Sequence, residues 1–227
     1  AIFVYKNTIC QYGETQVFET VPIDIELSVK DITQTRAIIS GRLTLPENDK
    51  ELEVGLLCST TSELTIATEG VKKAVVTDIM DADGGFSHRA EGLLFDNTHY
   101  CRHYVKQGDT YTYGSVQDFK TETVSGSISV SDITQTRATF NGRIELTEGD
   151  LIEVGVLYSQ KSDLTVGASG VIKQKLTPDS SGRILHNAEG LQNATTYNYC
   201  YYAYQNGKYT YGKTKTFTTQ SVKVSLS

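Results

Sequence analysis

Apolar and polar residues alternate with a period of two through most of the chain. The alternation is clear over residues 23–29, 36–45, 52–60 and 100–105. Such alternation is typical of β-strands with one buried face, whereas a helix would repeat apolar residues every three or four positions. Turn residues separate the strands, and Asn206-Gly207 is a strong signal for a two-residue hairpin. The pattern therefore predicts an all-β fold.

The sequence also repeats itself at a spacing of roughly 100 residues, a common domain size. The hexapeptide Asp-Ile-Thr-Gln-Thr-Arg occurs at residues 31–36 and again at residues 132–137. Further shared blocks follow in the same order in both copies, and they are Glu53-Val54-Gly55 with Glu153-Val154-Gly155, Ala90-Glu91-Gly92-Leu93 with Ala188-Glu189-Gly190-Leu191, and Tyr113-Gly114 with Tyr211-Gly212. A fixed period of this kind indicates tandem structural units.

The repeats predict two complete units between two partial ones. Residues 22–121 and 124–219 each hold a complete β-sandwich of seven strands, and residues 1–20 match the last two strands of a preceding repeat. Residues 222–227 alternate like the first strand of a following repeat. The connectors are short, so we expect serially joined sandwiches, arranged as beads on a string, within a longer array.

A tyrosine near the start of the sixth strand is expected to fasten each sandwich. The motif is Leu191-x-x-x-Thr195-x-Tyr197 in the second complete unit, and we align Leu94-x-x-x-Thr98-x-Tyr100 with it in the first. In Greek-key sandwiches such a tyrosine returns its hydroxyl group to upstream backbone. Tyr100 and Tyr197 are therefore the predicted structural corners.

These motifs resemble the fibronectin type III family. The residues that carry the likeness are Thr35-Arg36-Ala37, Thr136-Arg137-Ala138, Gly155-Val156-Leu157-Tyr158-Ser159, the corner motifs, Tyr211-Gly212 and Phe217-Thr218-Thr219. The sequence is most similar to the divergent version repeated in secreted and surface proteins of Bacteroidetes. The resemblance implies tandem fibronectin type III or immunoglobulin-like sandwiches and an extracellular or bacterial cell-surface location, and it leaves activity open.

Composition and charge argue against two classes of partner. The net charge is −6, whereas binding to nucleic acid requires clustered Lys and Arg side chains that neutralise phosphates. No apolar run approaches the ~18 residues of a membrane-spanning helix. We therefore expect no nucleic-acid partner and no span across a membrane.

The cysteines leave two alternatives open. Cys58 and Cys101 could fall on neighbouring strands of one sheet. Cys58 shares the parity of the apolar Leu56, whereas Cys101 has the parity opposite to the corner residue Tyr100, and side chains on opposite faces cannot be bridged. The parity favours small buried thiols over a disulfide.

No set of residues converges on a catalytic or metal site. The four histidines, His88, His99, His103 and His186, do not recur at equivalent positions in our alignment. His99 and His103 would lie ~13 Å apart on one strand at ~3.3 Å per residue, too far to share a metal. Asp81-x-Asp83-Gly84 resembles the start of a calcium loop but lacks the later carboxylates, which favours a plain turn. We expect no catalytic, metal-binding or cofactor-binding residues, and therefore no enzyme.

The chain contains 14 tyrosines and no tryptophan. Tyr202, Tyr204 and Tyr209 lie on or beside the last hairpin, whose outer face could present aromatic rings to a ligand. Packing in the core and pairing across strands is the favoured interpretation of these rings.

The leading functional hypothesis is a non-enzymatic structural stalk or repeat module of an extracellular or cell-surface adhesin or filament. Its partners would be neighbouring repeats of the same chain. The alternative is a module that binds a host glycan or surface protein through the tyrosine-rich face. A third hypothesis makes the units spacers in a larger secreted enzyme.

Overall fold

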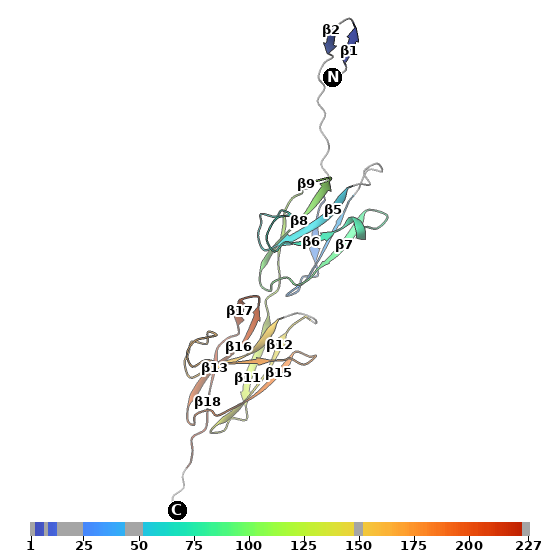
Figure 1. The fold of residues 1–227 in the computed structure, drawn as a ribbon. Helices are drawn as coiled ribbons and strands as arrows, with labels where there is room; N and C mark the ends of the chain where they lie inside the picture. Colours follow the sequence, from blue (N-terminus) through green and yellow to red (C-terminus); the bar gives the residue numbers. More distant parts are fainter. Residues whose placement is uncertain (1–2, 7–8, 13–24, 44–51, 148–151, 224–227) are drawn as a thin grey trace, which may run out of the picture.

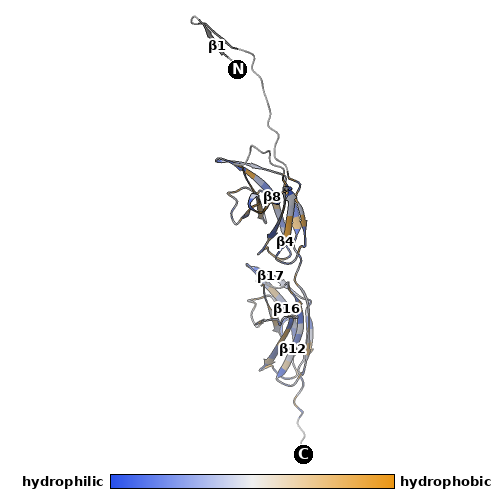
Figure 2. Ribbon diagram, turned by 90° about the vertical axis from the view of Figure 1, so that its right-hand side faces the viewer, coloured by the Kyte–Doolittle hydropathy of each residue, from blue (hydrophilic) through white to orange (hydrophobic). Residues whose placement is uncertain are grey.

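The computed structural model describes residues 3–6, 9–12, 25–43, 52–147 and 152–223. Within these ranges the secondary structure consists of β-strands and one 3-10 helix, η1 (Thr77–Ile79), with no α-helix. The all-β class predicted from the alternation is therefore confirmed. No described helix is long and apolar enough to cross a membrane. In Figure 2, apolar and polar residues are interspersed along the strands of both sandwiches, as a period of two requires.

The first sandwich packs a three-stranded sheet against a five-stranded sheet (Figure 1). The smaller sheet has the order β3-β4-β7, with bounds β3 (Ser28–Lys30), β4 (Ala37–Arg42) and β7 (Gly85–Ala90). The larger sheet has the order β10-β8-β5-β6, and β9 also pairs with β8; the bounds are β5 (Glu53–Ser59), β6 (Lys72–Val75), β8 (Thr98–Gln107), β9 (Thr110–Tyr113) and β10 (Gln117–Lys120). All pairs are antiparallel.

The second sandwich repeats this arrangement strand for strand. Its smaller sheet has the order β11-β12-β15, with bounds β11 (Ser125–Ser131), β12 (Arg137–Glu145) and β15 (Arg183–Glu189). Its larger sheet has the order β14-β13-β16-β17, and β18 also pairs with β16; the bounds are β13 (Glu153–Ser159), β14 (Ile172–Leu176), β16 (Thr196–Gln205), β17 (Lys208–Tyr211) and β18 (Lys215–Thr218). The shared strand order supplies a residue-by-residue equivalence between the two sandwiches.

The strand expected after each hairpin is divided into two segments that both pair with the same neighbour. In the second sandwich β17 ends at Tyr211 and β18 begins at Lys215. Gly212 lies in the gap, and a Cβ atom there would collide with the ring of Tyr201. Gly114 faces the ring of His103 in the same way. The repeated Tyr-Gly dipeptide is therefore explained by an aromatic or imidazole ring that lies over the glycine.

The hairpin of β1 (Phe3–Lys6) and β2 (Ile9–Tyr12) has the register of the last hairpin of the chain. Val4 pairs with Gln11 and Tyr5 with Cys10, just as Ala203 pairs with Thr210 and Tyr204 with Tyr209. The assignment of residues 1–20 to a partial unit stays a prediction. Residues 13–24 and 224–227, and with them most of the strand expected at 222–227, lie outside the described residues.

Each sandwich has its own apolar core between its two sheets. In the first, aliphatic side chains such as Ile39, Val54 and Leu56 dominate the core. In the second, the ring of Phe140 packs against Tyr158, Tyr199 and Phe217, with ring centroids 5.1–5.7 Å apart. The two sandwiches therefore have the same fold, but aromatic rings make up more of the core in the second sandwich.

Candidate functional site

A disulfide joins Cys58 on β5 to Cys101 on β8, which corrects the expectation of free buried thiols. The two residues are direct partners in the antiparallel register, with their Cα atoms 4.3 Å apart. The parity argument was wrong because it placed Tyr100 in the core, whereas Cys101 is the buried residue and Tyr100 lies half-buried on the other face. Disulfides persist mainly in oxidising compartments. The bond therefore agrees with an extracellular setting.

Tyr197 forms the expected corner of the second sandwich. Its hydroxyl oxygen accepts a hydrogen bond from the backbone N–H of Gln192 at 3.0 Å. Its ring stacks on Phe217, with the centroids 5.5 Å apart. A backbone group that would otherwise lack a partner is thus satisfied by a buried side chain.

Tyr100 does not form the corner of the first sandwich, and that prediction was wrong by one residue. His99 takes the equivalent place: its ring stacks on Phe119 with the centroids 5.7 Å apart, and its Nε2–H donates to the carbonyl oxygen of Leu94 at 3.1 Å. Burial lowers the pKa of His99 and outweighs the opposing effect of its bond to Leu94, so the neutral ring is favoured. The alignment slipped because Leu93 and Leu94 are adjacent and either could match Leu191.

His88 and His186 occupy equivalent positions, which corrects our alignment of the histidines. His88 pairs with Ile39 on β4, and His186 pairs with Phe140 on β12. Desolvation lowers the pKa of both half-buried rings. Among the described residues, no group of three or more His, Cys, Asp or Glu side chains is placed to hold a metal ion.

The acidic turns form ordinary side-chain-to-backbone hydrogen bonds. Asp81 Oδ1 accepts from the backbone N–H groups of Asp83 at 2.9 Å and Gly85 at 2.7 Å. Asp179 Oδ1 accepts from Ser181 at 2.8 Å and Arg183 at 3.0 Å in the equivalent turn. The carboxylates therefore close turns in both sandwiches, as Asp commonly does.

Tyr202 is fully buried, so it cannot serve as the ligand contact that the sequence suggested. It belongs to a small apolar cluster with Leu157, Leu164 and Cys200, outside the main core. Leu164 lies in the segment between β13 and β14, which covers this face of the larger sheet. Tyr204 and Tyr209 are half-buried, and their ring centroids lie 4.5 Å apart.

A lysine of the chain itself occupies the tyrosine-rich face. Lys173 Nζ lies 5.0 Å from the ring centroid of Tyr202, 5.7 Å from that of Tyr204 and 5.3 Å from that of Tyr209. These are cation–π distances. The Glu153 carboxylate pairs with Lys173 at 2.8 Å and accepts the Tyr202 hydroxyl at 2.9 Å. The ammonium group of Lys173 is therefore already held by three tyrosine rings and the Glu153 carboxylate.

The first sandwich repeats this Glu–Lys–Tyr clasp with Glu53, Lys73 and Tyr104. The Tyr104 hydroxyl donates to Glu53 at 2.6 Å, and Lys73 pairs with Glu53 at 3.0 Å. Hydrogen bonds from Tyr104 and Lys73 lower the pKa of Glu53, and burial raises the pKa of Tyr104 to about 12. A Cβ atom at Gly55 would collide with the Tyr104 ring, which explains the repeated Glu-Val-Gly block.

The two sandwiches meet where the β16–β17 hairpin contacts the loop between β7 and β8. Gln205 is the centre of this junction and is only 7% exposed. Its Nε2 donates to the carbonyl oxygen of Leu93 at 3.0 Å, and its Oε1 accepts the backbone N–H of Phe95 at 3.0 Å. The amide therefore satisfies one donor and one acceptor of the neighbouring loop at once.

Phe95 and Lys208 complete this side of the junction. Phe95 comes from the first sandwich, is fully buried, and belongs to the core cluster of the second sandwich. Lys208 Nζ donates to the carbonyl oxygens of Phe95 at 3.2 Å and Asp96 at 2.6 Å. It also lies 3.7 Å from the Asp96 carboxylate. The buried Phe95 ring and the Lys208 ammonium group thus hold the same loop, between β7 and β8, against the second sandwich.

A second contact involves Gln34 of the repeated hexapeptide. Gln34 Nε2 donates to the carbonyl oxygen of Glu145 at 3.3 Å, and its Oε1 accepts the Thr147 hydroxyl at 2.6 Å. The neighbouring Thr33 carbonyl accepts the backbone N–H of Glu122 at 3.1 Å, which holds the connector between the sandwiches. The hexapeptide therefore binds the connector and the next sandwich together.

The known proteins that resemble this chain were found among solved structures. No family model matches the chain, and no curated protein matches it in sequence. A segment of two fibronectin type III domains from chicken tenascin is similar at 16% identity, with a TM-score of 0.40, and covers 87% of this chain and 100% of its own. The sensor domain of the anti-sigma factor RsgI4 from Pseudobacteroides cellulosolvens is similar at 25% identity, with a TM-score of 0.35, over 46% of this chain and 99% of its own.

A redesigned β-sandwich protein is also similar, at 23% identity and a TM-score of 0.34, over 44% of this chain and 93% of its own. The fold assignment itself follows from the strand order. Three strands face five in each half, and the larger sheet carries the terminal hairpin. This is the arrangement of immunoglobulin-like domains, to which fibronectin type III modules are related in architecture. The chain is an all-β protein that contains two such sandwiches in succession.

Proposed function

We propose that the chain is a structural module whose two sandwiches act as one stiff segment of an extracellular stalk. The junction carries this proposal. Gln205, Phe95 and Lys208 bond or pack across it, and Gln34 adds a second contact on another loop. Two contacts that do not share a loop resist both bending and twisting. Figure 1 shows the sandwiches arranged end to end, as a stalk requires.

The setting we propose is the surface of a bacterium or a secreted filament or adhesin. The Cys58–Cys101 disulfide supports it, because such bonds are rare in reducing compartments. The likeness of the motifs to repeats in Bacteroidetes surface proteins points the same way. The proposal assigns no catalytic role to the chain and makes neighbouring repeats its partners.

Binding through the tyrosine-rich face has less support. Tyr202 is covered, and Lys173 already lies against three of the rings. A ligand would have to displace this lysine from Glu153 as well as from the rings.

Residual dipolar couplings on the full chain test the stiffness of the junction. We expect one alignment tensor to fit both sandwiches. The double variant Gln205→Ala with Lys208→Ala should give two different tensors, because the loop of the first sandwich loses both side-chain clamps. Gln107→Ala is the matched control, since Gln107 holds the place of Gln205 in the first sandwich and is exposed. Independent tensors in the unmodified chain would contradict the proposal.

A further inference from the structure

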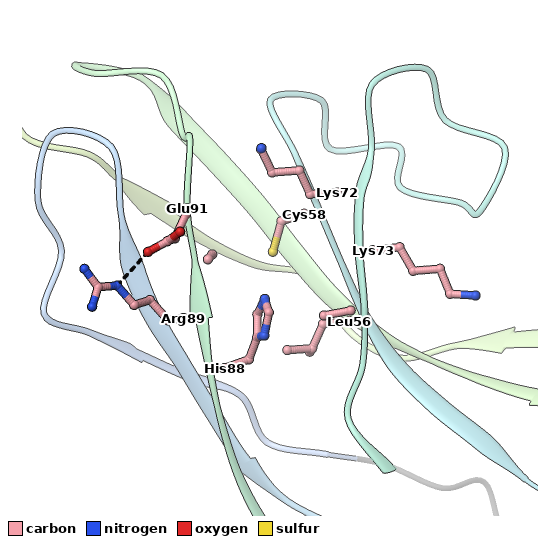
Figure 3. Close-up of a pocket in the computed structure, with 9 residues that line it drawn as sticks. Leu56, Cys58, Lys72, Lys73, His88, Arg89 and Glu91 are labelled. Carbon is pink, nitrogen blue, oxygen red and sulfur yellow. Dashed lines mark ion pairs between the residues drawn. The ribbon is translucent and has the colours of Figure 1, made fainter. Parts of the chain in front are cut away.

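The first sandwich has a cavity of about 360 Å³ beside its disulfide. It opens between β6 and β7, which are the outer strands of different sheets and form no ladder with each other. Figure 3 shows Leu56, Cys58 and the ring of His88 around this space. Ala74 and Ala90 add small side chains to the lining. The cavity is therefore mostly apolar at its base and open at the side of the sandwich.

The second sandwich fills the equivalent space with rings. Tyr158 occupies the place of Cys58, and Tyr199 that of Cys101, because both pairs are direct partners in the same register. The Tyr158 ring lies 6.1 Å from the ring of His186, which is the equivalent of His88. The first sandwich thus lacks a phenol ring next to its histidine.

The rim of the cavity carries more positive than negative charge. Its charged residues are Lys72, Lys73, Arg89 and Glu91. Arg89 pairs with Glu91 at 3.0 Å, and Lys73 points away toward Glu53 (Figure 3). Lys72 has no ion pair with any described residue. Its equivalent in the second sandwich is Ile172, so the positive charge occurs only where the ring is missing.

A second hollow lies next to the first. It has a volume of about 280 Å³, shares Cys58 and Lys72 with the cavity, and reaches His99 and Asn206. Asn206 belongs to the hairpin of the second sandwich, beside Gln205. Lys72 therefore lines both spaces.

We propose that this cavity binds a small aromatic carboxylate. Its ring takes the place that Tyr158 has in the second sandwich, against the disulfide and the imidazole of His88. Its carboxylate pairs with the ammonium group of Lys72. The cavity has apolar side chains at its base and charged residues at its rim, and small-molecule sites commonly combine an apolar lining with a few placed polar groups. Nothing in the structural role of the chain requires this site, so the two proposals stand or fall separately.

The test is a titration of the ¹⁵N-labelled full chain with 4-hydroxyphenylacetate, which joins a phenol ring to a carboxylate. We expect saturable shifts of the amides of Leu56, Lys72 and His88, with the amides of β13–β15 unchanged. Lys72→Ile, which copies the second sandwich, should weaken binding about tenfold or more, the loss of one charge-assisted contact. The uncharged 4-hydroxyphenylacetamide should bind the unmodified chain more weakly by a similar factor.

A variant whose own side chains fill the cavity provides a second test of the proposal. Cys58→Tyr with Cys101→Tyr copies the pair of the second sandwich and should abolish binding while the amide spectrum remains dispersed. The proposal is overturned if no saturable shift occurs up to about 10 mM probe, a range that includes weak sites. It is also overturned if Lys72→Ile binds as well as the unmodified chain, or if the shifts lie outside the lining.

Discussion

At the scale of single residues, the same two positions carry different chemistry in the two sandwiches. Cys58 and Cys101 are joined covalently in the first, and Tyr158 and Tyr199 occupy their places in the second. A disulfide chiefly restricts the unfolded chain, whereas aromatic rings gain stability from buried area and ring contacts. The two sandwiches therefore depend differently on the redox conditions, although their strand order is identical.

We predict that reduction destabilises only the first sandwich. The bond closes a loop of 43 residues, for which the loss is expected to be about 2–4 kcal/mol in the free energy of unfolding. Amide hydrogen exchange with and without reductant separates the sandwiches: protection should fall in β4, β5 and β8 and hold in β12, β13 and β16. Cys58→Ser with Cys101→Ser should reproduce the effect without reductant. Equal protection in β5 and β8 under both conditions would refute it.

Residue parity could have found the disulfide if the corner had been placed correctly. One slip, between Leu93 and Leu94, moved the corner from His99 to Tyr100 and reversed the face assigned to Cys101. A histidine is an unusual residue at a position where the second sandwich has Tyr197, so no sequence pattern pointed to it. The bonds of His99 to Leu94 and of Tyr197 to Gln192 become comparable only once the loop is folded.

At the scale of elements, alternation was sufficient to place most strands, because each has one buried and one exposed face. It could not predict the gap after Tyr113 or Tyr211, which depends on a ring contributed by the neighbouring strand. The alternation also did not predict that the outer face of the larger sheet is covered. There the segment after β13 packs Leu164 onto Tyr202, so both faces of β16 are buried in part.

The Glu–Lys–Tyr clasps predict how stability changes in acid. The pKa of Glu53 and Glu153 is lowered in the folded chain, so the unfolded chain binds protons more readily. Their contribution is therefore complete above the ordinary pKa of 4.5 and is lost as the pH falls through the lowered values. Glu53→Gln with Glu153→Gln should flatten the fall of the thermal midpoint between about pH 5 and pH 3.

The control for this experiment is Glu189→Gln, because the Glu189 side chain is 65% exposed and lies outside both clasps. We expect the control to follow the acid profile of the unmodified chain. If the double variant and the unmodified chain lose stability in parallel, the clasps do not contribute through their carboxylates.

At the scale of the whole molecule, the junction lay beyond sequence reasoning. Its contacts join residues separated by about 110 positions, such as Phe95 and Gln205, and nothing local in either segment indicates the other. Two signals existed in retrospect. The hexapeptide around Gln34 is repeated although it lies in a loop, and Phe95 is an aromatic residue in a segment where the second unit has Asn193.

Phe95 makes the stability of the second sandwich depend on the first. We predict that Phe95→Asn, which copies the residue of the second unit, lowers the free energy of unfolding of the second sandwich by about 3–5 kcal/mol, as for loss of a buried ring. The first sandwich should change little, because Phe95 packs in the neighbouring core. Asn193→Ala is the matched control at an exposed position, with an expected change within about 0.5 kcal/mol. Hydrogen exchange in β12 and β16 measures the effect, and protection there that survives Phe95→Asn would show that the sandwiches touch without stabilising each other.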